Sequence, residues 1–226
     1  MSPSTYYTLV ASLPQLPHFE VAGWLPLSRK QLDQRLSMLT REDALQLRAA
    51  EDLVEWQRQP ITRTNQQVAD KYRKLVPGIS NPSLREFVEY RMAQRSALVA
   101  LRRKRLGLPA PEAGEIWGVG PWLNLMASSW ERDDLGLGNL LPWITEAANL
   151  LEAGAALDLE RLLMAAVWTR LGHIAERSPF GFEPVIAFVF RWDILQRWLS
   201  YNAGLGKVRF QELVAEVTRE QQKLFA

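Results

Sequence analysis

Apolar residues recur every three to four positions along most of the chain, the spacing that predicts amphipathic helices. The clearest case is "NPSLREFVEYRMAQRSALVALRRKRLG", which has Asn81 as a cap, Pro82 in the first turn and Gly107 just past the end. Shorter patterns with the same period predict helices before it, over residues 29–36, 41–59 and 65–75. The N-terminal half is therefore predicted to be helical.

Three arginines lie on the apolar face of the helix predicted after Asn81. At about 100° per residue, Arg91, Arg95 and Arg102 share a face with Phe87 and Leu98. An unpaired charge removed from water is costly. We therefore expect these arginines either to extend to solvent or to pair with acids on neighbouring helices.

The periodicity fails over residues 109–141, where glycine and proline predict a connector with one short helix near residues 123–130. Helical patterns resume over residues 142–153, from a cap at Asp158 to residue 177, and over residues 183–202 and 207–225. No strand-rich segment interrupts them. The sequence predicts an all-α helical bundle, with an N-terminal lobe over residues 1–108, the connector, and a C-terminal lobe over residues 142–226.

The segment "FRWDILQRWLSYNAGLG" carries large apolar side chains on nearly every side of the predicted helix. Trp192 lies on its main apolar face, whereas Phe190 and Trp198 lie outside that face. Such a pattern indicates a helix packed on more than one side. Asp193 and Arg197 are four residues apart and suit a pair along the helix, so their charges need no catalytic explanation.

Composition narrows the chemistry. The chain has 226 residues, no cysteine, two histidines and a net charge of +2. The lack of cysteine excludes thiol catalysis, thiolate zinc sites and disulfides. His173 precedes Glu176, the reverse of the Glu-x-x-His order of helical di-metal sites. We therefore predict no catalytic, cofactor-binding or metal-binding residues and no enzymatic activity.

The uncharged N-terminal stretch lacks a basic start, and prolines interrupt it, so neither a secretion signal nor a membrane-spanning helix is expected.

One charge block stands out, formed by Arg102, Arg103, Lys104 and Arg105. It is either a contact for phosphates or an acidic protein face, or a solvated helix end whose cations suit the negative end of the helix dipole. It lacks the interleaved aromatic residues that stack on single-stranded bases. These four residues are the candidate partner-binding residues.

Three segments carry a resemblance: "YYTLVASLPQLP", "LSRKQLDQRLSMLTREDALQL" and "FVFRWDILQRWLSYNAGLGKVRFQELV". They resemble an uncharacterised bacterial family encoded in V-type ATPase operons, itself similar to a shortened V-type ATPase C/d subunit, the helical socket between the central rotor shaft and the membrane ring. The resemblance implies a non-enzymatic, cytoplasmic subunit, peripheral to the inner membrane. It also implies that the protein links or aligns shaft and ring during ion transport, with other ATPase subunits as partners and no cofactor or small-molecule substrate.

Socket subunits are built from repeated helical units, and "ALVALRRKRLGL" and "ILQRWLSYNAGL" overlay with leucine at Leu98 and Leu195 and glycine at Gly107 and Gly204. This overlay favours two related helical lobes. The alternative function is an all-α module that binds nucleic acid or anionic lipid through the same basic block, with a steep dependence on salt.

Overall fold

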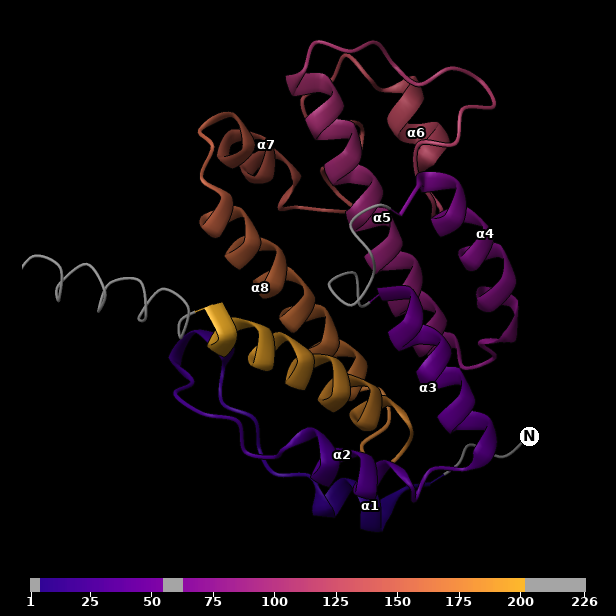
Figure 1. Cartoon of the computed structure of the whole chain (residues 1–226), viewed down its shortest axis with the longest axis vertical. Coiled ribbons are helices and arrows are strands. Elements are labelled where there is room, and N and C mark those ends of the chain that lie inside the picture. Colours follow the sequence, from indigo (N-terminus) through magenta and orange to yellow (C-terminus); the bar gives the residue numbers. More distant parts are fainter. Residues whose placement is uncertain (1–4, 55–62, 202–226) are drawn as a thin grey trace, which may run out of the picture.

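The computed structural model describes residues 5–54 and 63–201, and every regular element within them is helical, which confirms the all-α prediction. Figure 1 shows their arrangement. In chain order the elements are α1 (Tyr7–Ser12), the 3-10 turn η1 (Phe19–Val21), α2 (Arg29–Leu36), α3 (Arg41–Val54), α4 (Asn65–Leu75), the 3-10 turn η3 (Val76–Gly78), α5 (Pro82–Arg105), α6 (Leu123–Ser128), α7 (Ile144–Glu152) and α8 (Ala156–Ala175), followed by a helix over residues 183–201. Three predicted features lie outside the described residues: the helix over residues 207–225, the end of the helical pattern that runs up to Pro60, and Gly204 of the overlay.

Side-chain caps explain where several helices begin. The Ser28 hydroxyl accepts from the Gln31 amide in a full capping box at the start of α2. Asn81 accepts from the Leu84 amide at the start of α5, as predicted. Thr64 and Gln67 form a second capping box ahead of α4. Each cap satisfies amide donors that have no partner within the helix.

The prediction that Asp158 caps α8 is wrong. The helix begins at Ala156, and Asp158 lies in its first turn. Gly154 explains the earlier start: it adopts a φ of 69°, which ends α7, and the next amide, of Ala155, donates back to Leu150 O at 2.9 Å. The chain therefore enters α8 almost directly from α7, and Asp158 still lies near the positive end of the helix dipole.

α5 is the central helix of the bundle. Figure 1 shows α3 and α4 on one side of it and α7 and α8 on the other. Its apolar residues Leu84, Phe87 and Val88 are completely buried. One continuous core cluster extends from Tyr6 to Trp192, so both predicted lobes contribute to the same core. The division into two related lobes stays a prediction.

The 183–201 helix is packed on several sides, as its sequence predicted. Val189 has no exposed surface and Trp192 is 1% exposed. The Trp192 indole Nε1 donates to Leu27 O at 2.8 Å, which ties this helix to the N-terminal segment. On another side, the rings of Phe190 and Phe87 lie 4.5 Å apart, which joins the helix to α5.

The connector packs against α5. Its one short helix, α6, lies where the sequence predicted it, and Trp117 and Trp130 are buried. The hydroxyl of Ser96 in α5 accepts from the Val119 amide at 2.8 Å and donates to Val119 O at 2.7 Å. A Cβ on Gly118 would lie 2.7 Å from Ser96 Oγ, so glycine permits this close approach. Because both polar groups of Val119 bond to one buried hydroxyl, the connector is fixed to α5.

A carboxylate between two arginines joins α5 to α8. Glu86 accepts from Arg170, and it accepts from Arg177 just beyond α8 at 2.6 and 3.1 Å. The hydrogen bonds from Arg177 and the charge of Arg170 hold the pKa of Glu86 below its ordinary value. This ion-pair network lies partly exposed at the edge of the bundle.

Candidate functional site

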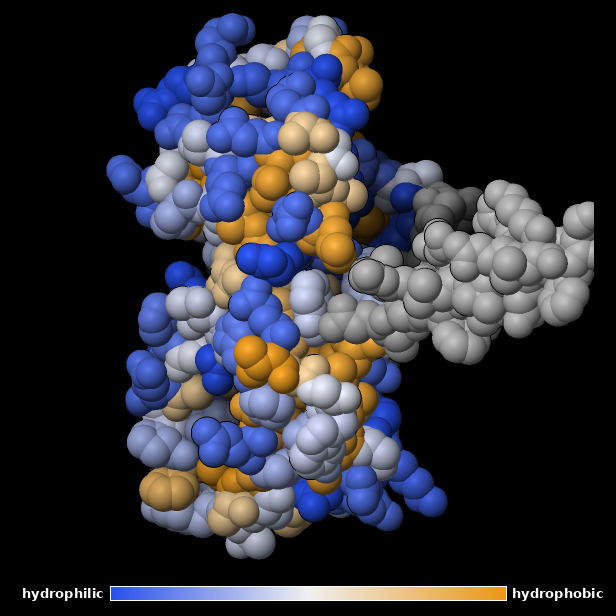
Figure 2. All heavy atoms as spheres, turned by 90° about the vertical axis from the view of Figure 1, so that its left-hand side faces the viewer, coloured by the Kyte–Doolittle hydropathy of each residue, from blue (hydrophilic) through white to orange (hydrophobic). Residues whose placement is uncertain are grey.

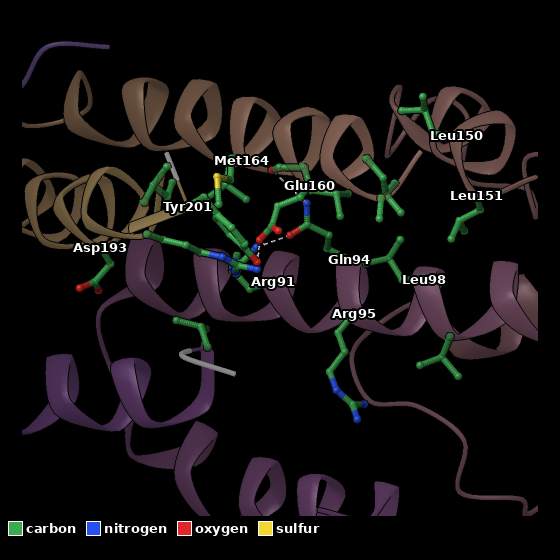
Figure 3. A pocket seen from close by; sticks show the side chains of 18 of the residues that line it. Arg91, Gln94, Arg95, Leu98, Leu150, Leu151, Glu160, Met164, Asp193 and Tyr201 are labelled. Atoms are coloured by element: carbon green, nitrogen blue, oxygen red, sulfur yellow. Dashed lines mark hydrogen bonds and ion pairs between the residues drawn. The ribbon is translucent and has the colours of Figure 1, made fainter. Parts of the chain in front are cut away.

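A groove of about 810 Å³ lies between α5, α8 and the 183–201 helix, and Figure 3 shows many of its side chains. We call it the α5 groove. The end of α3 adds Val54 to the lining, and the end of α7 adds Leu150 and Leu151. From α5 itself the main contributors are Phe87, Arg91, Gln94, Arg95, Leu98, Arg102 and Arg105. The groove therefore combines an apolar surface with a row of cations on one helix.

The middle of the groove holds a polar chain that joins α5 to α8. Arg91 donates to the Gln94 side-chain oxygen, and Gln94 Nε2 donates to Leu163 O at 3.3 Å. Gln94 has no exposed surface. Burial of Arg91, together with the nearby charge of Arg197, lowers the pKa of the Arg91 guanidinium to about 10. Arg91 remains charged at neutral pH within a largely desolvated setting.

Among the described residues that line the groove there are two carboxylates, Glu160 of α8 and Asp193 of the 183–201 helix. Arg197 forms an ion pair with Glu160, which joins the 183–201 helix to α8. Asp193 Oδ1 lies 4.0 Å from Arg29 Nη1 of α2. Arg197 and Asp193 therefore link the 183–201 helix to α8 and α2. Both carboxylates have an arginine from another element beside them.

Arg95 lies across α5 from Arg91 and points away from it in Figure 3. One of its terminal nitrogens donates to Asn65 Oδ1 at 3.1 Å, and the other is buried without a hydrogen-bond partner among the described residues. Burial lowers the pKa of Arg95, and the charges of Arg63 and Arg102 lower it further. The sequence led us to expect either extension to solvent or a pair with an acid, and Arg95 instead is partly buried and bonds to a neutral amide.

The structure divides the predicted basic block in two. Arg103 pairs with Glu115 and donates to Pro109 O at 2.8 Å. Lys104 Nζ donates to Arg132 O at 2.7 Å. Both side chains thus hold segments of the connector against the end of α5. Their contacts are internal to the protein.

The other two members of the block, Arg102 and Arg105, line the α5 groove. Arg105 donates to Leu151 O at 2.6 Å, a neutral acceptor. Arg102 is exposed and makes no side-chain hydrogen bond or ion pair to any residue that the structure describes. These two residues, together with Arg91 and Arg95, are the cations that α5 contributes to the groove lining.

Sequence reasoning did not identify Gln94 or Glu160 as groove residues. A signal for the groove was present in the spacing of Arg91, Leu98 and Arg105, which recur every seven residues. This is the period of a helix face that meets another helix along its length.

The described residues contain no group of three or more His, Asp or Glu side chains placed to hold a metal ion. None of the described helices combines the length and apolar character needed to cross a bilayer. Figure 2, which views the molecule from the side of α7 and α8, shows apolar patches separated by hydrophilic side chains.

Comparison of the chain with models of protein families, with curated proteins and with solved structures gives no match. The groove is therefore interpreted from its own geometry and charge.

Proposed function

We propose that the protein is a non-enzymatic subunit of a bacterial V-type ATPase that links or aligns the central rotor shaft and the membrane ring. The resemblance of the two ends of the chain to the family encoded in V-type ATPase operons supports the choice of this complex. In this role the protein lies in the cytoplasm, peripheral to the inner membrane, and its partners are other ATPase subunits.

The single structural observation that carries a protein-binding role is the α5 groove. It is built from long helices joined by buried contacts, such as that between the rings of Phe87 and Phe190, whose centroids lie 4.5 Å apart. Besides leucines, its lining contains arginines, aromatic side chains and a methionine, the residue types that are enriched at protein–protein interfaces. A helical body that passes force between two subunits needs such a rigid docking surface.

The alternative role, binding of nucleic acid or anionic lipid, depends on several free cations in the basic block. Arg103 and Lys104 are engaged with the connector, so two of the four cations are already used within the protein. The groove arginines lie among leucines, which suits protein side chains better than a phosphate backbone. We therefore favour a protein partner.

The test is to purify the V-type ATPase through another subunit, from cells whose chromosomal copy of this gene carries an epitope tag. We expect the tagged chain to co-elute in a fixed ratio with rotor-shaft or ring subunits. In membranes from a deletion strain, we expect ATP hydrolysis to persist while ATP-driven ion transport falls. A tagged chain that never co-elutes, together with normal transport in the deletion strain, would contradict the proposal.

A further inference from the structure

The charge in the α5 groove is strongly unequal. Among the described residues that line it there are five arginines and two carboxylates, and no lysine or histidine. Both carboxylates, Glu160 and Asp193, already lie beside an arginine from another element. Arg95 and Arg105 bond to neutral oxygen atoms, and Arg102 is exposed without a partner in the described part of the chain. The groove therefore carries positive charge that a negative occupant would neutralise.

Arg91 and Arg105 mark the length of α5 that lines the groove. Arg91 and Arg105 are fourteen residues apart on α5, which at 1.5 Å per residue is about 21 Å, or four helical turns. Leu98 lies midway between them on the same face. Leu159 and Leu163 of α8 add apolar surface on the wall. Figure 3 shows α5 and α8 running side by side along this length.

A groove that carries leucines and charges along the length of one helix suits an amphipathic helix, whose apolar side chains contact the leucines and whose charged side chains flank them. A carboxylate that approaches Arg95 or Arg102 gains a charge-assisted hydrogen bond, strongest where water is excluded. A lysine at the same place meets like charge. The groove therefore favours a partner helix whose flanking residues are negatively charged.

We propose that the α5 groove binds an amphipathic helix of another protein, one that carries leucine-like residues on its inner face and glutamate or aspartate beside them. The proposal rests on the proposed function only in taking the partner to be a protein. The partner segment is an acidic helix of about four turns. Arg95 and Arg102 are assigned as the residues that contact its acidic side chains.

The test uses the full-length protein and two fluorescent synthetic peptides of eighteen residues that differ only in their flanking positions. One peptide has leucines at heptad core positions with glutamates beside them, and the other has lysines in place of the glutamates. Fluorescence anisotropy at physiological salt is the readout. We expect the acidic peptide to bind at least about tenfold more tightly than the lysine peptide, because complementary charges at a docking surface set its specificity.

Charge reversal in the groove, Arg95→Glu with Arg102→Glu, should weaken binding of the acidic peptide by about tenfold or more and strengthen binding of the lysine peptide. The matched control is Arg41→Glu with Arg48→Glu in α3, two exposed arginines with the same spacing of seven and outside the groove. The control should leave both affinities within about twofold. Because Arg95 is partly buried, Arg102→Glu alone is a second test that keeps the fold.

Several results would overturn the proposal. Equal affinity for the two peptides, or equal losses in the groove and control variants, would mean that binding follows net charge alone. Displacement of the acidic peptide by an RNA oligonucleotide of similar affinity would indicate a nucleic-acid site. Self-association in sedimentation equilibrium that Arg102→Glu abolishes would make a second copy the occupant. Failure to bind either peptide would exclude an acidic helix but would leave co-purification with the ATPase unchanged.

Discussion

Replacing Trp192 with phenylalanine removes the hydrogen bond that ties the 183–201 helix to the N-terminal segment. Trp192 is 1% exposed, and its Nε1 donates to Leu27 O at 2.8 Å. Phenylalanine is smaller than tryptophan, so the substitution also loses packing worth about 1 to 2 kcal/mol. The unpaired carbonyl of Leu27 adds about 1 to 2 kcal/mol. We therefore expect Trp192→Phe to lower the free energy of unfolding by about 3 kcal/mol.

Trp198→Phe is the matched control on the same helix. Trp198 is 9% exposed, and its Nε1 is buried without a hydrogen-bond partner among the described residues. Phenylalanine at this position loses similar packing but removes an unsatisfied donor, which offsets about 1 kcal/mol of the cost. The expected loss is about 1 kcal/mol or less, so the two variants should differ by about 2 kcal/mol.

The assay is urea unfolding followed by far-ultraviolet circular dichroism, because tryptophan fluorescence changes with the substitutions themselves. A difference of about 2 kcal/mol corresponds to about 1 M of urea between the two midpoints when the slope is about 2 kcal/mol per molar. If Trp198→Phe proves as destabilising as Trp192→Phe, or more so, the assignment of the indole hydrogen bond as a principal tie between these segments is wrong.

Two further predictions concern the attachments of α5. Ser96→Ala leaves both backbone polar groups of Val119 unpaired and should lower the free energy of unfolding, measured in urea, by about 2 kcal/mol. The control Ser128→Ala, at an exposed site, should change it very little. Equal losses in the two variants would contradict this prediction. Glu86→Gln should cost about 1 kcal/mol at pH 7 after allowance for solvent screening. Because Arg177 lowers the pKa of Glu86, this stabilisation is present above pH 4.5 and is lost as the pH falls through the lowered pKa. The melting temperatures of wild type and variant should therefore converge in acid. A difference in melting temperature that widens in acid would contradict the reasoning.

Local signals in the sequence were enough to place most of the helices. The cap at Asn81, the proline after it and Gly107 bracket α5, which the structure gives as Pro82–Arg105. Such signals act within one or two helical turns. The start of α8 was missed because the left-handed glycine at Gly154 outweighs the capping preference of Asp158.

The groove was only partly predictable, because periodicity tells which face of a helix is apolar but not which helix lies opposite. Gln94 bonds to Leu163 O in α8, sixty-nine residues away, and the pattern around Gln94 does not indicate that partner. The four residues of the basic block are adjacent in the sequence, but successive residues on a helix point about 100° apart. That rotation sends Arg102 to the groove and Arg103 to the connector.

The central proposal is that the α5 groove holds a subunit of the V-type ATPase. Photo-cross-linking in living cells tests it most directly, with a photoreactive amino acid in place of Arg102 in one strain and in place of the exposed Lys30 of α2 in another. We predict that position 102 cross-links to a rotor-shaft or ring subunit of the V-type ATPase and that position 30 does not. An absence of ATPase subunits among the products at position 102, or the same products from both positions, would contradict the account.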